Sequence, residues 1–265
     1  MLSSEEVKRI ALEVGFDACG IAHADSLTDE EYPLRGWLAK GWHAGLSYME
    51  RIVEMRMDPR LLVHGARSVI CCVSAYPPPI LPLGKEERPE GGRGYKPGVA
   101  AYAQGREYHK VLKDMLFSLR ERLGIDGKVC CDTVPISDKH WAARAGLGFI
   151  GRHTLLVTPQ WGSWVNLGEI VTTEECSEYS EYSEYSEYSE YSECSDNPDF
   201  CARCRRCVDA CPNHAIAPSG PPMIDVSRCT AYYTTHHERP IPPGHVTAGY
   251  TQGCDICQLA CPFNR

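Results

Sequence analysis

The sequence lacks any apolar run as long as the roughly 18 residues that a transmembrane helix needs. Its start, Met-Leu-Ser-Ser-Glu-Glu, has neither the basic region and apolar core of an export signal nor a twin arginine. Membrane insertion and export are therefore not expected. The sequence predicts a cytoplasmic protein.

A net positive charge, the usual mark of a nucleic-acid partner, is also missing, since the 265 residues carry a formal charge of −8. Residues 175–195, however, consist of seven Glu-Tyr-Ser or Glu-Cys-Ser units with seven glutamates and no positive charge. Without this tract the net charge is −1, so local basic patches remain possible. The tract has no hydrophobic periodicity, which predicts an acidic linker over residues 174–197.

Cysteine, in contrast, is abundant, with fifteen residues. In a cytosolic protein such a number indicates metal or redox chemistry and not a disulfide framework. Residues 201–212 have the C-x2-C-x2-C-x3-C-P spacing that binds cubane iron–sulfur clusters, and residues 254–262 repeat a shorter version ending in Cys-Pro. A structural zinc module is the alternative, because C-x2-C pairs also bind zinc. The two Pro-terminated sets are more typical of ferredoxins.

Two [4Fe–4S] clusters need eight thiolates, and the two motifs supply seven. Cys229, which lies between them, is the natural eighth ligand. In double-cluster motifs the last cysteine of each set binds the other cluster. One cluster is therefore assigned to Cys201, Cys204, Cys207 and Cys261, and the other to Cys211, Cys229, Cys254 and Cys257.

The remainder of the chain predicts an α+β fold, with an α/β domain over residues 1–173 followed by a ferredoxin-like double [4Fe–4S] domain over residues 198–265. Ser3 and Glu6 form a capping-box pattern at the start of a helix that ends at Gly15. Another amphipathic helix is expected over residues 106–123, and a short one over residues 141–147. Apolar runs predict strands at residues 18–22, 67–76, 129–131 and 167–172.

Gly146, Gly148 and Gly151 match the G-x-G-x-x-G pattern of dinucleotide-binding turns. They follow no clear strand, and no acidic residue stands at the expected distance, so NAD binding is not predicted. The glycines either allow backbone to approach a large planar cofactor or simply form turns.

Several segments occur in an order typical of one enzyme family: residues 102–109 (Tyr-Ala-Gln-Gly-Arg-Glu-Tyr-His), 132–135 (Asp-Thr-Val-Pro), 145–154 (Ala-Gly-Leu-Gly-Phe-Ile-Gly-Arg-His-Thr), 162–164 (Gly-Ser-Trp), 228–232 (Arg-Cys-Thr-Ala-Tyr) and 253–258 (Gly-Cys-Asp-Ile-Cys-Gln). Together they resemble epoxyqueuosine reductase over nearly the whole chain except the acidic tract. The resemblance implies reduction of epoxyqueuosine to queuosine at the wobble position of tRNA. It also implies a cobalamin in the amino-terminal domain, fed by two [4Fe–4S] clusters. Many members continue into a helical-repeat domain that helps to hold tRNA, whereas this sequence stops at Arg265.

By this resemblance Asp132 is the catalytic acid, because opening an epoxide and expelling its oxygen as water needs protons. Burial is expected to favour its protonated form, although a lone Asp at a strand end is otherwise most often a turn or helix cap. The resemblance also implies a cobalamin pocket formed by Arg56, Tyr102, Asp132, His153, Thr154, Gln160 and Ser163.

The expected partners are the tRNA anticodon loop that carries epoxyqueuosine and an external electron donor such as a flavodoxin or ferredoxin. No membrane partner is expected, and the chain is predicted to be a monomer. Arg203, Arg205 and Arg206 either meet tRNA phosphates or form an ordinary solvated face. Two alternative functions are a reductive dehalogenase, which usually carries a twin-arginine signal, and a non-enzymatic electron carrier or cobalamin-handling protein.

Overall fold

A computed structural model of the chain describes residues 2–29, 31–78, 96–105, 107–179, 198–235 and 239–264. The first helix, α1 (Ser4–Val14), begins and ends where the sequence predicts. The Ser3 side chain accepts a hydrogen bond from the Glu6 backbone N–H, and Gly15 ends the helix in the left-handed conformation with φ 113°. Because this conformation strains any residue with a Cβ, glycine is the favoured residue at this position.

The four predicted apolar runs form one sheet in the order β1-β2-β6-β3, and every pairing in it is antiparallel. The strands are β1 (Ala18–His23), β2 (Ser68–Ala75), β3 (Lys128–Cys130) and β6 (Val165–Thr172). β2 and β6 lie in the centre, and the β2 residues from Val69 to Val73 have no exposed surface. Burial on both faces explains why these strands read as continuous apolar runs and not as alternating ones.

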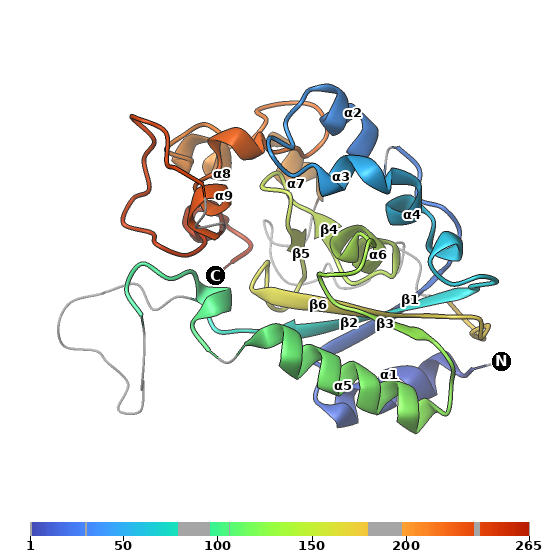
Figure 1. Cartoon of the computed structure of the whole chain (residues 1–265). Helices are drawn as coiled ribbons and strands as arrows, with labels where there is room; N and C mark the ends of the chain where they lie inside the picture. Colours follow the sequence, from blue (N-terminus) through green and yellow to red (C-terminus); the bar gives the residue numbers. More distant parts are fainter. Residues whose placement is uncertain are drawn as a thin grey trace, which may run out of the picture.

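Helices cover both faces of the sheet (Figure 1). On one face α1 packs with α5 (Tyr108–Leu123), whose Leu112, Leu116 and Leu119 are buried; the helix starts two residues later than predicted. On the other face lie α6 (Asp138–Arg144) and the hairpin of β4 (Phe149–Ile150) and β5 (Leu156–Val157). The short helix expected at residues 141–147 therefore begins and ends three residues earlier.

The segment between β1 and β2 contains short helices that the sequence pattern did not predict: α2 (Leu34–Ala39), α3 (Tyr48–Arg51), α4 (Val53–Met57) and η1 (Pro59–Leu61). η2 (Ala101–Ala103) precedes α5. The cysteine-rich part contains α7 (Pro198–Arg203), α8 (Arg206–Ala210), η4 (Val226–Arg228), α9 (Thr230–Thr235) and α10 (Ile256–Leu259). In Figure 1 this part sits beside α2 and above one end of the sheet.

The glycines of residues 146–151 serve the chain's own turns. Gly148 has φ 157°, and a Cβ there would lie 2.2 Å from the Val157 carbonyl oxygen. Close packing of β4 against β5 thus requires glycine at this position. The sequence left open whether these glycines approach a planar cofactor or form turns. Gly148 serves the turn between the chain's own strands.

The start of the acidic repeat packs on the sheet body, contrary to the expectation of a linker from residue 174. The Leu2 backbone N–H donates to the Glu175 carbonyl, and Cys176 is buried among the side chains between α1 and the sheet. The ring of Tyr179 stacks on His23 with a centroid separation of 3.3 Å, and its hydroxyl lies 3.3 Å from the Ser68 Oγ. Residues 180–197, the remainder of the predicted linker, lie outside the described residues.

No helix among the described residues is long and apolar enough to cross a bilayer.

Candidate active site and cluster-binding region

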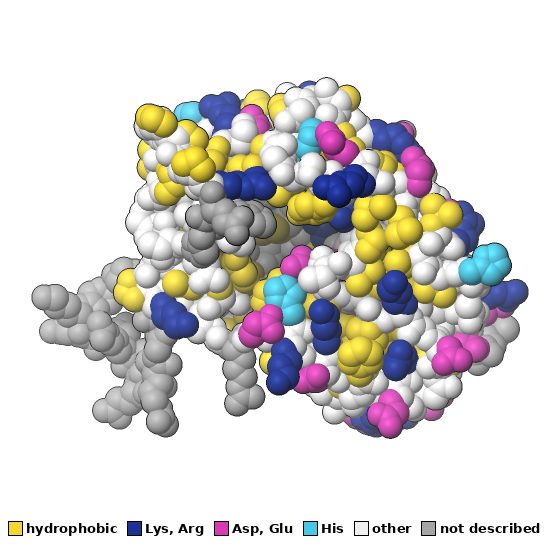
Figure 2. Space-filling model, in the orientation of Figure 1, with side chains coloured by type: hydrophobic (Ala, Val, Ile, Leu, Met, Phe, Trp, Pro, Cys, Tyr) yellow, Lys and Arg dark blue, Asp and Glu magenta, His cyan; other side chains and the backbone are white. Residues whose placement is uncertain are grey.

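A cavity of about 450 Å³ lies between α2–α4, α6, the start of β6 and the segment 222–224. Figure 2 shows the hollow near the middle of one face, flanked by hydrophobic and basic side chains. Its walls combine aromatic and aliphatic groups, including Tyr32, Trp37 and Leu167, with charged residues. Mostly apolar walls with a few polar groups are typical of sites for organic ligands and cofactors.

Asp132 lies at the mouth of this cavity, in the turn that follows β3, with a positive φ of 55°. Its Oδ2 atom is 2.8 Å from Nε2 of His109 and accepts a hydrogen bond of 3.4 Å from the Tyr108 hydroxyl. The other ring nitrogen of His109 contacts Glu107. The Asp132 side chain is 60% exposed, so the expectation that this carboxyl is buried is wrong. The side-chain contacts of this carboxyl come from Tyr108 and His109, at the start of α5.

Hydrogen bonding determines the charge of His109. Burial alone would lower the pKa of His109, but hydrogen bonds to Asp132 and Glu107 outweigh it and raise the pKa above its ordinary value of 6.5. At neutral pH a larger fraction of His109 is therefore protonated than of a free histidine.

A second acidic group lies deeper, where Asp138 of α6 meets Glu169 of β6. Glu169 has no exposed surface. Burial raises the pKa of its carboxyl well above 4.5, and the negative charge of the nearby Asp138 raises it further. Asp138 borders the cavity, and burial raises its pKa as well. The next residue, Lys139, donates to the Thr154 carbonyl at 2.6 Å, and burial lowers the pKa of Lys139 to about 8.

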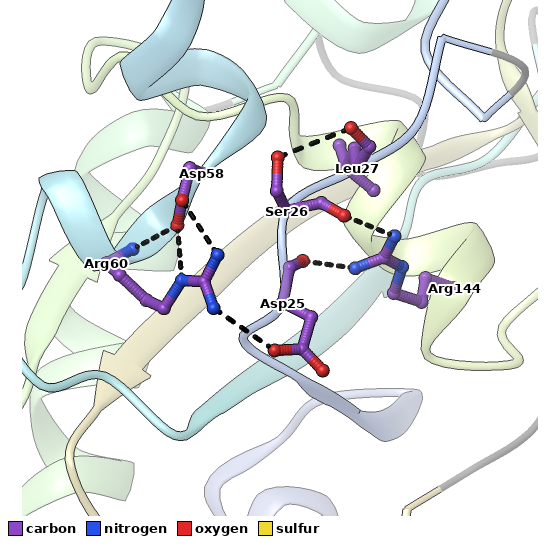
Figure 3. Close-up of polar contacts among 6 residues, drawn as sticks. All are labelled: Asp25, Ser26, Leu27, Asp58, Arg60 and Arg144. Atoms are coloured by element: carbon purple, nitrogen blue, oxygen red, sulfur yellow. Dashed lines mark hydrogen bonds and ion pairs between the residues drawn. The ribbon is translucent and has the colours of Figure 1, made fainter.

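Helix α6, which carries these groups, is fixed at its far end by Arg144. The Arg144 guanidinium donates to the carbonyl oxygens of Asp25 and Ser26 (Figure 3). It also forms an ion pair with Glu31. Arg60 reaches the same loop through the Asp25 carboxylate, at 3.3 Å, and holds Asp58 as well. The loop after β1 thus ties α6 to the short helices that form another wall of the cavity.

Of the predicted cobalamin residues, Arg56, Asp132 and Thr154 line the cavity. The other four lie elsewhere. Tyr102 packs edge-on against Tyr108, Gln160 is exposed in a turn, and His153 is buried with its Nδ1 accepting from the Leu155 N–H. Ser163 is bonded to Gln258 and Asn264 of the cysteine-rich part.

The eight motif cysteines gather in two electrostatically interacting groups. Cys261 interacts with Cys201, Cys204 and Cys207. The second group is centred on Cys257, whose thiol interacts with Cys254, Cys229, Cys211 and also with Cys207 of the first group. This grouping is the one that cross-ligation predicts, with Cys207 and Cys257 at the junction of the two sets.

Backbone amides already point at these sulfurs. The Arg152 N–H lies 3.3 Å from the Cys201 Sγ, and the Ala215 N–H lies 3.3 Å from the Cys211 Sγ. Such N–H groups tune iron–sulfur clusters.

Two protein-family descriptions match the chain. Residues 200–264 match a 4Fe-4S double cluster binding domain, and residues 56–133 match "Epoxyqueuosine reductase QueG, DUF1730". An epoxyqueuosine reductase of Leadbetterella byssophila is 35% identical, over 98% of this chain and 80% of its own length. One of Cyclobacterium marinum is 36% identical, over 98% and 78%. The chain belongs to the epoxyqueuosine reductase family. The resemblance seen in the sequence is confirmed, and the family is one of oxidoreductases.

Solved structures agree with this assignment. The epoxyqueuosine reductase of Streptococcus thermophilus superposes with a TM-score of 0.76 at 27% identity, covering 98% of this chain and 66% of that one. Another epoxyqueuosine reductase, crystallised with an epoxyqueuosine-modified tRNA stem loop, gives 0.79 at 28% identity, covering 98% and 64%. The chain thus spans slightly less than two thirds of these solved chains. The reductive dehalogenase NpRdhA gives 0.58 at 16% identity, which shows a common fold alone, and the dehalogenase alternative is not favoured.

The predicted fold class and cofactors are confirmed: a mixed α/β body is followed by a double-cluster domain, and the family uses two [4Fe–4S] clusters and cobalamin. The chain has features that suit these groups. Buried and half-buried thiols interact in two sets of four, as two cubes need. The cavity has an aromatic and apolar wall, and the buried Arg56 Nε on this wall has no hydrogen-bond partner in the described part of the chain.

Sequence reasoning missed the Asp138–Glu169 pair and the role of His109. A carboxylate in the middle of an otherwise apolar strand was the available signal for Glu169. Asp138 follows Ser137 at a helix start, where an acidic residue is ordinary, so its sequence gave no such signal. His109 is the last residue of the family segment 102–109, but only the fold brings it to Asp132.

Proposed function

We propose that this chain catalyses the two-electron reduction of epoxyqueuosine to queuosine in the anticodon loop of tRNA. Both carbon–oxygen bonds of the epoxide break, a carbon–carbon double bond forms, and the oxygen leaves as water. The balance requires two electrons and two protons. The observation that carries the proposal is the position of Asp132 at the cavity mouth, hydrogen-bonded to His109, in a chain whose family relatives carry this name.

Asp132 is the proposed acid toward the epoxide oxygen. The proton that Asp132 gives to the epoxide is proposed to come from a neighbouring side chain. His109, whose imidazolium is favoured, supplies that proton across the 2.8 Å contact. Tyr108 and His109 also fix the direction of the carboxyl. His109 is thus a positioning and proton-supplying residue, and Asp132 is the group that meets the substrate.

Cobalamin binding in the cavity is proposed to involve Arg56 and Thr154. When bound, cobalamin supplies a strongly reducing cobalt centre to the cavity. Arg56 offers a charged donor for polar groups of the ligand, and the aromatic wall of Tyr32, Tyr48 and Trp37 excludes water. Ser163 and His153, also predicted as pocket residues, are proposed to support the cavity from behind, through the cysteine-rich part and the backbone of β5. Tyr102 is proposed to hold the ring of Tyr108 in place. Gln160 is not among the residues that line the cavity, so a role for it in binding cobalamin is not proposed.

The proposed ligands of one cluster are Cys201, Cys204, Cys207 and Cys261, and those of the other are Cys211, Cys229, Cys254 and Cys257. Burial raises the pKa of the Cys229 thiol to about 11 and that of Cys261 to about 12, so the charge of iron is needed to hold these groups as thiolates. Electrons are proposed to enter from an external flavodoxin or ferredoxin.

The proposed substrate is tRNA, bound by a cytoplasmic monomer. Arg203, Arg205 and Arg206 are exposed beside the first cluster motif. Arg205 also pairs with Asp209 at 3.3 Å, a solvent-exposed contact of small energy that phosphate can replace. These three arginines are the proposed phosphate contacts.

The test is anaerobic incubation of cluster-loaded protein, cobalamin and a chemical reductant with an anticodon stem–loop that carries epoxyqueuosine. Mass spectrometry should show loss of one oxygen atom from the modified base, and a stem–loop that already carries queuosine is the control. If the protein reduces cobalamin but leaves the epoxide untouched, the electron-carrier function replaces this proposal.

A further inference from the structure

The reaction proposed above consumes two protons, while Asp132 provides one donor at the mouth of the cavity. A second carboxylic group of the same cavity is Asp138, whose side chain interacts with that of Glu169. Neither residue has a role in binding substrate or clusters in the proposal so far. Both belong to rigid elements, α6 and β6, that pack directly on each other.

The contact between the two carboxyls is unusual because donors are absent around it. Glu169 has no exposed surface, and neither of its carboxyl oxygens receives a hydrogen bond from another group of the described residues. The Oδ1 atom of Asp138 is likewise closed to solvent and without a donor. Two ionised carboxylates cannot remain in contact in such surroundings, whereas one shared proton converts the repulsion into a hydrogen bond. At least one proton is therefore held between Asp138 and Glu169.

The surrounding charges decide which carboxyl keeps that proton. Burial and the charge of Asp132 favour the neutral form of Asp138, whereas the positive charges of Arg56 on α4 and Lys139 on α6 favour its ionised form. For Glu169, burial comes first, and then Asp138, the thiol of Cys131 and Asp132 all raise its pKa. Other titratable groups that interact with the pair are Cys71, Cys72, Cys130 and Tyr32. Glu169 is thus the site of storage, and Asp138 is the outlet, since it borders the cavity.

We propose that Asp138 and Glu169 share one proton beneath the cavity and deliver it through Asp138 as the second proton of the reduction. This inference rests on the proposed function. On release, the O–H bond of the pair breaks and a new O–H bond forms on the departing epoxide oxygen or on a water molecule in the cavity. The electrons come from the external donor already named. The pair then takes up a proton from solvent before the next turnover.

Infrared difference spectroscopy of the full, cluster-loaded chain tests the shared proton directly. We expect the C=O stretch of a neutral carboxylic acid at neutral pH, sensitive to deuterium exchange. Glu169→Gln, which keeps the shape of the side chain, should abolish it. Glu13→Gln, the same change at a surface carboxylate paired with Arg9 and Arg122, should leave it intact. Absence of the band in the parent would overturn the proposal.

The outlet is tested with Asp138→Asn, which retains Asp132. Turnover of the epoxyqueuosine stem–loop should fall by roughly 10²-fold, within the usual range for loss of an acid, while cobalamin binding is unchanged. The parent rate should decline as the pH rises through the titration of the pair and through that of His109, whereas in the variant only the decline that follows His109 should remain. An unchanged rate and pH profile would refute the delivery step.

The shared proton and the proposed function can be refuted separately. Turnover by a parent that lacks the neutral-acid band refutes the shared proton and leaves the proposed function standing. A clear band in a parent that never reduces the epoxide refutes the proposed function, and with it the donor role.

Discussion

The Nε2 atom of His109 lies 2.8 Å from the Oδ2 atom of Asp132, across the mouth of the cavity. The first residue is on α5, and the second is in the turn after β3. The contact joins the acid proposed for the reaction to a histidine whose pKa is raised by the same contact, against the opposing effect of burial. It provides the first of five predictions.

The pKa of His109 should exceed 6.5 in the parent and fall in Asp132→Asn, because the amide removes the negative partner. A raised histidine pKa means that the folded state binds the proton more tightly than the unfolded state. The pairing therefore contributes stability at pH values below about 6.5, and this contribution is lost as the pH rises through the raised pKa. Histidine NMR titration measures the shift, and equal pKa values in both proteins would contradict the contact.

Asp132→Asn should lower epoxide turnover by roughly 10²- to 10⁴-fold, as is typical when a general acid is removed. Cobalamin binding and its reduction should persist, since neither step needs this proton. Asp114→Asn, an exposed change on α5, is the matched control. Parent-like turnover in Asp132→Asn would remove this residue from the mechanism, and loss of cobalamin binding would make it a pocket residue.

Cys229→Ser should reduce the iron content toward about four atoms per chain from about eight, because it removes one ligand of one cube. Cys176→Ser is the control, since Cys176 is buried between α1 and the sheet and belongs to neither thiol group. Iron analysis and electron paramagnetic resonance of the reduced protein measure the outcome. Full iron loading in Cys229→Ser would place the eighth ligand elsewhere.

Tyr179→Ala should destabilise the fold by about 1–3 kcal/mol, because it removes the stacking on His23 and the hydroxyl contacts with Ser68 and the Cys176 N–H. Tyr185→Ala changes the composition of the repeat identically. Thermal unfolding compares the two variants, and we expect the lower Tm for Tyr179→Ala. Equal Tm values would mean that Tyr179, in the second repeat unit, adds nothing to the stability of the body.

Glu169→Gln should change how stability depends on pH. Because the folded parent holds the proton of the acid pair more tightly than the unfolded chain does, its stability falls as the pH rises above the ordinary carboxyl pKa of 4.5. The variant lacks this titration. Its Tm relative to the parent should therefore be higher at about pH 8 than at about pH 5. A constant Tm difference across this range would contradict the raised pKa.

The sequence by itself determined the features that depend on neighbouring residues. The spacing of Cys201, Cys204 and Cys207 predicts one cluster loop. The capping by Ser3 and Gly15 sets the ends of α1, and apolar runs located the four strands of the sheet. Each of these follows from local geometry or from burial, which leave a direct pattern in the sequence. The family resemblance similarly rested on short ordered motifs.

Only the tertiary structure decided the features that depend on distant residues. It placed His109 against Asp132, left that carboxyl largely exposed where burial was expected, and buried Glu169 against Asp138. It also packed the first unit of the acidic repeat against α1 and the sheet. A carboxyl group's protonation depends on which charges, donors and solvent surround it. Those surroundings come from separate elements, so no local pattern in the sequence encodes them.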